Sequence, residues 1–191
     1  LLAGDNAAVP SPYDFALGGK GLDPSLPGGV SGTLLQAGQC FMVDMGGNFY
    51  GYMGDMSRVF SIGKLPEQAY AAHQTCLETQ EEIVAMAKPG TVCEDMYNKA
   101  IEIVTKAGFA DYFMGVDQKA KFIGHGIGLE INEMPVLAPR MKQELEPGMV
   151  FALEPKIVLP GIGPVGIENS WAVTTDGLEK LTLCKEEIIE L

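Results

Sequence analysis

Apolar and polar residues alternate in two parts of the chain, and a helical pattern lies between them. Residues 40–62 alternate on both sides of a Gly-Gly-Asn sequence that begins at Gly46, which predicts a β-hairpin with its turn there. Residues 149–173 read MVFALEPKIVLPGIGPVGIENSWAV and predict a second pair of strands around Gly161. A strand is also expected after Phe122, and a last short one near residues 181–183.

The intervening segment predicts two helices. The first follows Pro66 and runs towards Ala87, because Lys-Pro-Gly comes directly after it. Its expected buried stripe is Tyr70, Leu77 and Val84. We expect His73, on the same stripe, to have a packing role.

The second helix is expected to begin at Thr91, with Glu94 three residues later in a capping-box pattern, and to end at Gly108. Its expected apolar stripe is Val92, Met96, Ala100, Val104 and Ala107. Strand blocks around a pair of helices predict an α+β fold rather than a doubly wound sheet.

Composition limits the classes of protein to which the chain can belong. Its 191 residues suit one domain over residues 1–191, and a net charge of −12 argues against nucleic-acid binding. No apolar run approaches the roughly 18 residues that span a bilayer, and the first residues lack the basic start of a signal peptide. The four cysteines form no CxxC motif, which predicts buried or free thiols and a cytoplasmic location.

Four acidic residues form two pairs, each straddling a predicted turn. Asp44 and Asp55 lie in the first hairpin, and Glu154 and Glu168 lie on either side of Gly161. Residues at equal distances from a turn face each other across an antiparallel ladder, so we expect each pair to be opposed. Like charges in apolar strands repel unless a cation lies between them, and two divalent ions would balance four carboxylates.

His125, which lies between two glycines in FIGHGIGLEINE, completes the candidate site. Glycines allow the backbone to approach a crowded site closely. Carboxylates and an imidazole without a thiolate suit Mn, Co, Fe or Zn in a catalytic site rather than a cysteine-type structural zinc. Two such ions about 3.5–4 Å apart are a common hydrolytic arrangement.

The motifs VDMGGNFYGYMGDMSRVF, GHGIGLEINEMP, PGMVFALEPK and GIENSWAVTTDGLEKLT resemble those of the pita-bread metallopeptidases, which include methionine aminopeptidase, aminopeptidase P and prolidase, with creatinase as a metal-free relative. The resemblance implies a curved antiparallel sheet covered by helices. It also implies two metal ions, with Mn or Co preferred, and hydrolysis of short peptides of the Xaa-Pro type by a metal-bridging hydroxide. In this pattern Asp44 holds the first metal, Asp55 and Glu168 bridge both, and His125 and Glu154 bind the second. Glu154 is also the expected proton acceptor.

The same resemblance singles out positions for substrate. Asn132 and Ser11 stand where peptidases of this family have histidines, and Arg140 stands where some dipeptide-cleaving relatives have an arginine that binds a carboxylate. Asn and Ser donate hydrogen bonds but do not shuttle protons near neutral pH. Gly166 occupies a position at which prolidases often have an arginine.

Family members begin the catalytic domain earlier, so the chain is expected to be the C-terminal catalytic fragment of a longer protein. An uncovered strand edge would then favour association, and we expect a homodimer. Two alternatives to an Xaa-Pro peptidase stay open. One is a hydrolase of a small non-peptide amide, lactam or amidine, and the other is a non-catalytic binding module that retains the fold.

Overall fold

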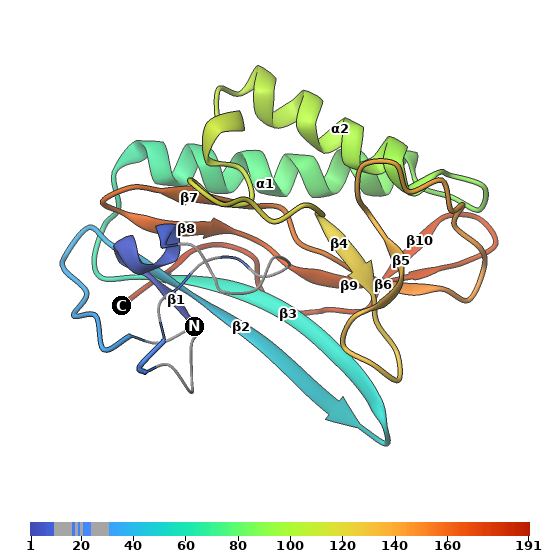
Figure 1. The fold of residues 1–191 in the computed structure, drawn as a ribbon, viewed down its shortest axis with the longest axis horizontal. Helices are drawn as coiled ribbons and strands as arrows, with labels where there is room; N and C mark the ends of the chain where they lie inside the picture. The colour runs from blue at the N-terminus through green and yellow to red at the C-terminus, as the bar shows by residue number, and fades with distance from the viewer. Residues whose placement is uncertain (10–16, 18, 20, 24–30) are drawn as a thin grey trace.

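The computed structural model describes residues 1–9, 17, 19, 21–23 and 31–191, which form an α+β fold with two α-helices on one side of antiparallel sheets (Figure 1). The helices are α1 (Glu67–Met86) and α2 (Cys93–Lys106), with short 3-10 turns at Gly4–Ala8 and Ala110–Tyr112. The strands are β1 (Leu2–Ala3), β2 (Cys40–Phe49), β3 (Tyr52–Ser61), β4 (Gly124–Gly126), β5 (Glu133–Val136), β6 (Val150–Leu153), β7 (Lys156–Leu159), β8 (Gly163–Gly166), β9 (Asn169–Val173), β10 (Leu178–Lys180) and β11 (Ile189–Glu190).

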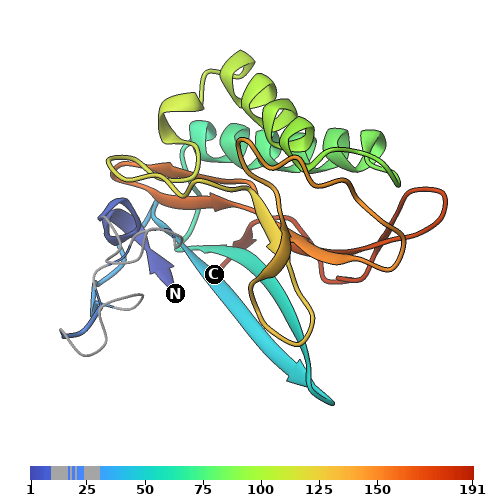
Figure 2. The ribbon, with the colours of Figure 1, turned by 45° about the vertical axis from the view of Figure 1, so that its right-hand side comes forward.

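The described strands form three hydrogen-bonded groups. Their orders are β1-β2-β3-β11, β10-β9-β6-β4-β5 and the pair β7-β8. All neighbours are antiparallel except β11 and β3, and a bridge between Ser57 and Glu168 joins the first group to the β8–β9 segment. Figure 2 shows the long β2–β3 hairpin extending from the side of the sheets opposite the helices.

The first hairpin forms as expected, but its turn lies later in the chain. Phe49 pairs with Tyr52, so the turn is Tyr50-Gly51, and both turn residues have positive φ angles of 52° and 89°. Such a two-residue turn matches the right-handed twist of the flanking strands. The prediction of a turn at Gly-Gly-Asn was therefore wrong, and these three residues lie within β2.

The corrected register changes how the first pair of acids meets. Asp44 lies opposite Ser57, and Asp55 lies opposite Gly46. The two aspartates are therefore diagonal neighbours and not the opposed pair that we expected. They still lie on one face of the hairpin, because diagonal positions in a ladder share a face.

The second hairpin has the predicted centre at Gly161 and passes through two sheets. Leu153 pairs with Asn169 in the five-stranded sheet, and Lys156 pairs with Gly166 in the two-stranded one. Glu154 and Glu168 lie between these pairs, at the junction of the two sheets, where ladder pairing is interrupted. Their carboxylates can therefore contribute to one site.

Helix α1 has the predicted bounds but a different buried face. Tyr70 is exposed and Leu77 and Val84 are half-buried, so the predicted stripe was wrong. The buried face consists of Ala69, Ala72, His73, Thr75, Cys76, Thr79, Gln80 and Ile83. Small and polar residues dominate this face because α1 lies directly on β7 and β8 and bonds to the strands beneath it.

Helix α2 packs on α1, and the centre of its predicted stripe is buried at Met96, Ala100 and Val104. Its first turn differs from the prediction. The helix begins at Cys93 without a side-chain cap. The Thr91 hydroxyl instead accepts from the backbone N–H of Lys88 and donates to the carbonyl oxygen of Met86 at the end of α1.

Smaller predictions had mixed outcomes. All four cysteines are free, with Cys184 exposed and the other three buried, as expected. The short strand predicted near residues 181–183 was misplaced: β10 ends at Lys180, β11 follows at Ile189–Glu190, and Leu183 is exposed. Within the described residues, neither helix combines the length and apolar character that a membrane span requires.

Candidate metal centre

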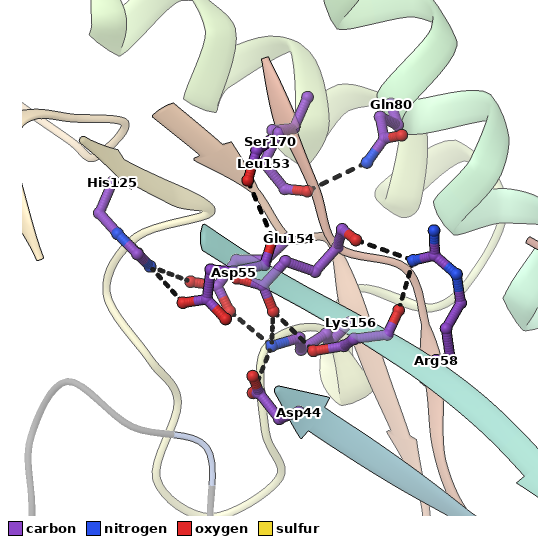
Figure 3. A network of polar contacts seen from close by, with 11 residues as sticks. Asp44, Asp55, Arg58, Gln80, His125, Leu153, Glu154, Lys156 and Ser170 are labelled. Carbon is purple, nitrogen blue, oxygen red and sulfur yellow. Dashed lines mark hydrogen bonds and ion pairs between the residues drawn. The ribbon is translucent and has the colours of Figure 1, made fainter. Parts of the chain in front are cut away.

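All five predicted ligands converge where the two hairpins meet. Figure 3 shows Asp44, Asp55, His125 and Glu154 pointing toward one another. Asp44 and Asp55 come from the β2–β3 hairpin, and Glu154 and Glu168 come from the sheet junction. His125 is on β4, where it pairs with Ala152 of β6, so it lies beside the strand that leads to Glu154. Of these side chains, only that of Asp44 is substantially exposed.

Lys156 lies at the centre of this cluster and was not among the predicted site residues. Its Nζ donates to Oε2 of Glu154 at 2.7 Å, Oε2 of Glu168 at 2.9 Å and Oδ2 of Asp44 at 3.1 Å. The lysine is 1% exposed. An ammonium has three N–H donors, so each donor has a carboxylate acceptor.

The ion pairs determine the charge states of this half of the cluster. Burial opposes ionisation of Lys156 and by itself would lower its pKa. The attraction of three negative carboxylates outweighs this effect and raises the pKa of the ammonium well above its usual value; they are those of Asp44, Glu154 and Glu168. Desolvation likewise opposes ionisation of Asp44, and the nearby Lys156 outweighs it and lowers the pKa of that carboxyl. Lys156 and Asp44 therefore form a charged pair near neutral pH.

A second group of ligand atoms gathers around His125 and shares Glu168 with the lysine. Ligand atoms of Asp55, His125 and Glu168 all lie within 4.8 Å of one another. His125 Nε2 is 3.8 Å from Oδ2 of Asp55 and 3.5 Å from Oε1 of Glu154. Burial and the neighbouring acids raise the pKa of Asp55 to about 8, and burial raises that of Glu154 to about 8 despite the opposing effect of Lys156.

The donor set in this group fits a divalent ion. Nδ1 of His125 lies 3.1 Å from the carbonyl oxygen of Gly126, which can only accept, so the neutral ring donates from Nδ1 and turns an unprotonated Nε2 towards the acids. Oδ1 of Asp55 is buried and has no hydrogen-bond partner. A divalent cation would bind both the lone pair of Nε2 of His125 and the unpartnered Oδ1 of Asp55.

The glycines around His125 are required by close backbone packing, as predicted. A Cβ at Gly124 would lie 2.4 Å from the carbonyl oxygen of Ala152, and one at Gly126 would lie 2.2 Å from that of Met134. Side chains at these positions would push β4 away from its neighbours and displace the imidazole.

Further residues hold the acids in place, and the sequence analysis missed them. The Ser57 hydroxyl donates to Oε2 of Glu168 at 2.6 Å. Nη1 of buried Arg58 donates to the carbonyl oxygen of Glu168, and Nη2 donates to Oδ1 of Asn169. On the other side, Gln80 of α1 donates to the carbonyl oxygen of Leu153, immediately before Glu154.

The predicted substrate residues have different positions. A cavity of about 440 Å³ adjoins the imidazole and is lined by Phe122, His125, Asn132, Glu133, Met134 and Val136. Asn132 thus lines the same cavity as His125. Arg140 does not line this cavity and lies near the start of α2, where its backbone N–H donates to Glu94. Ser11 lies outside the described residues.

The sequence matches metallopeptidase family M24 over residues 3–175. The chain belongs to this family. It is 31% identical over 185 residues to the Xaa-Pro dipeptidase of Pyrococcus furiosus, which covers 96% of the chain and 51% of that protein. It is also 32% identical over 154 residues to the Xaa-Pro dipeptidase of Lactobacillus helveticus, covering 81% and 40%. The chain spans about half the length of these curated M24 relatives.

Solved structures of M24 proteins confirm the pita-bread fold. The prolidase from Pyrococcus horikoshii OT3 superposes with a TM-score of 0.80 at 28% identity, over 99% of this chain and 48% of that one. The Xaa-Pro dipeptidase from Bacillus anthracis superposes with a TM-score of 0.77 at 34% identity, over 86% and 44%. The predicted family resemblance and fold class are therefore confirmed.

Proposed function

We propose that this protein is a metal-dependent aminopeptidase or dipeptidase that cleaves short peptides of the Xaa-Pro type, with Mn or Co as the preferred metal. The observation that carries the proposal is the convergence of Asp55, His125 and Glu168 on one point, with their ligand atoms within 4.8 Å of one another. The Xaa-Pro preference is supported by M24 relatives that are named Xaa-Pro dipeptidases.

Asp55, His125 and Glu168 would hold the metal. When bound, a divalent ion of this kind polarises a carbonyl and activates water for attack. Asp55 and His125 come from strands β3 and β4, and Glu168 forms a bridge with Ser57 of β3, so the three side chains are held in position before substrate arrives.

Glu154 is placed to move the proton. Its Oε1 faces the imidazole of His125, its Oε2 is held by Lys156, and burial raises its pKa to about 8. A carboxyl with a pKa near the working pH accepts a proton from water and returns it to a leaving amine efficiently. Asn132, at the wall of the adjoining cavity, would donate a hydrogen bond to the substrate carbonyl.

A second candidate function comes from the same asparagine. An amide at position 132 orients a carbonyl but does not transfer a proton near neutral pH, so the cavity also suits a small non-peptide amide, lactam or amidine. Hydrolysis of such compounds without cleavage of peptides would distinguish this function from the first.

The test is hydrolysis by the full-length protein after chelation and after reconstitution with Mn²⁺ or Co²⁺. Substrates would be Xaa-Pro dipeptides, Met-Xaa peptides and small cyclic amides. We expect release of the N-terminal residue from Xaa-Pro peptides only when metal is present. Asp55→Asn should lose this activity, while Asp176→Asn, at an exposed position beyond β9, should retain it. Failure of the metal-replete protein to cleave any of the peptides would contradict the proposal.

A further inference from the structure

The acid cluster contains one built-in cation. Lys156 is the first residue of β7, a strand whose four residues are all buried. Its ammonium contacts three of the four carboxylates, at 2.7 to 3.1 Å, and these come from β2 and from both sides of the sheet junction. A buried ammonium with a carboxylate for every N–H has no free donor.

We propose that the centre binds one divalent ion rather than two, and that the Lys156 ammonium permanently takes the place of the second. The inference rests on the metal-dependent function proposed above and concerns the number and position of the ions. The single ion would lie among Asp55, His125 and Glu168, and Asp44 would serve as a partner of Lys156 rather than as a metal ligand.

The partition of the ligand atoms supports this assignment. Oε2 of Glu154 faces Lys156, while Oε1 of the same carboxylate is 3.5 Å from Nε2 of His125. Asp44 lies outside the group whose ligand atoms meet within 4.8 Å, and that group includes Asp55. Lys156 donates to the other three carboxylates, so the buried, unpartnered Oδ1 of Asp55 is the acceptor for which a cation is still needed.

Charge favours one ion as well. Four carboxylates balanced by one ammonium and one divalent ion leave a single negative charge. A second divalent ion would give the cluster excess positive charge and would lie against the ammonium, because both would need the same oxygens of Asp44 and Glu154.

The residue opposite the lysine in the neighbouring strand has no side chain that could clash with it. Gly166 pairs with Lys156 and has a φ of 140°. A Cβ at Gly166 would lie 2.5 Å from the carbonyl oxygen of Pro155, 2.8 Å from Cα of Lys156 and 3.3 Å from its Cγ. The position across the ladder must therefore be glycine if Lys156 is to keep its backbone and stem where they are.

The experiment is a metal count on the full-length protein. After equilibrium dialysis against excess Mn²⁺, elemental analysis should give one ion per chain for the parent, and its electron paramagnetic resonance spectrum should be that of an isolated Mn²⁺. Lys156→Gly removes the ammonium and opens its space, so its count should rise from one to two with a spectrum of a coupled pair. Lys156→Arg keeps the charge, and Lys121→Gly changes an exposed lysine elsewhere, so both should stay at one.

The outcomes separate the two proposals. Two ions in the parent protein would overturn the inference about Lys156 and leave the metal-dependent function standing. A count that stays at one in folded Lys156→Gly would also overturn the inference. No ion in the parent and none in Lys156→Gly would contradict the metal-dependent function itself. If Lys156→Gly does not fold, the count and spectrum of the parent protein still decide.

Discussion

The Nζ of Lys156 lies 2.7 Å from Oε2 of Glu154, two residues before it in the chain. Residues i and i+2 of an extended segment point to the same face, so the Glu-Pro-Lys sequence by itself places an ammonium beside the carboxylate. This contact makes Glu154 both a partner of a fixed cation and, through Oε1, a neighbour of His125.

Glu154→Gln should abolish turnover while the fold is retained. The amide keeps the size of the side chain but takes up no proton, and loss of a positioned acid or base typically lowers rates by about 10²–10⁴. Hydrolysis of an Xaa-Pro peptide by the metal-loaded protein measures the effect, and the melting temperature reports on the fold. Glu102→Gln, at an exposed site on α2, is the matched control. Turnover by Glu154→Gln at the parent rate would show that Glu154 is not the proton acceptor.

Metal binding should release protons. Because burial and the neighbouring acids raise the pKa of Asp55 to about 8, this carboxyl is protonated at pH 6, and a metal ion that binds to it must displace the proton. Affinity for Mn²⁺ should rise between pH 6 and 8 by about tenfold per pH unit for each proton released, and level off above pH 8. Titration calorimetry in buffers of different ionisation enthalpy measures both quantities. An affinity that does not change with pH would contradict the raised pKa of Asp55.

The metal-free protein should lose stability as pH rises. The folded pKa of Glu154, about 8, lies above its ordinary value of 4.5, so the folded state binds more protons than the unfolded state between these values. The stability is fully present below pH 4.5 and decreases as pH rises towards 8. Urea unfolding at pH 6 and pH 8.5 in a chelator should show a lower free energy of unfolding at pH 8.5, and a smaller difference in Glu154→Gln. Equal or greater stability of the parent at pH 8.5 would contradict this assignment.

Gly166→Ala should destabilise the protein by roughly 1–3 kcal/mol, because a side chain there needs a rare backbone conformation and meets backbone atoms of Pro155 and Lys156. Gly47→Ala is the control, since nothing lies within 4 Å of a Cβ at Gly47 and its φ is not positive. Urea unfolding curves compare the two variants. If Gly166→Ala were as stable as Gly47→Ala, Gly166 would not be needed to accommodate Lys156.

The fold was predictable from the sequence to a large extent, because the hairpins and helices have strong local patterns. We predicted the turn of the first hairpin at Gly46 and Gly47 because glycines favour turns, whereas the structure has it at Tyr50 and Gly51. A non-glycine residue with a φ of 52° is a rare choice, and the register depends on how the hairpin packs on the rest of the molecule. The buried face of α1 was missed for a related reason. It is formed by small and polar side chains, which an apolar stripe does not reveal.

In the candidate site, the five predicted ligands do converge, since spacing and motif order encode them. Lys156 was overlooked although a signal was present: a single charged residue opens the apolar run KIVL, two positions after Glu154. A charged residue in a strand that is otherwise apolar needs a partner once it is buried. Arg58 gives no comparable signal, because its acceptors include main-chain carbonyls more than a hundred residues away.

The most direct test of the account is the anomalous scattering of Mn²⁺ in crystals of the full-length protein. A single peak among Asp55, His125 and Glu168, with the side chain of Lys156 still contacting Asp44, is the predicted result. No peak at these residues, or a peak at the position of the lysine ammonium, would contradict it.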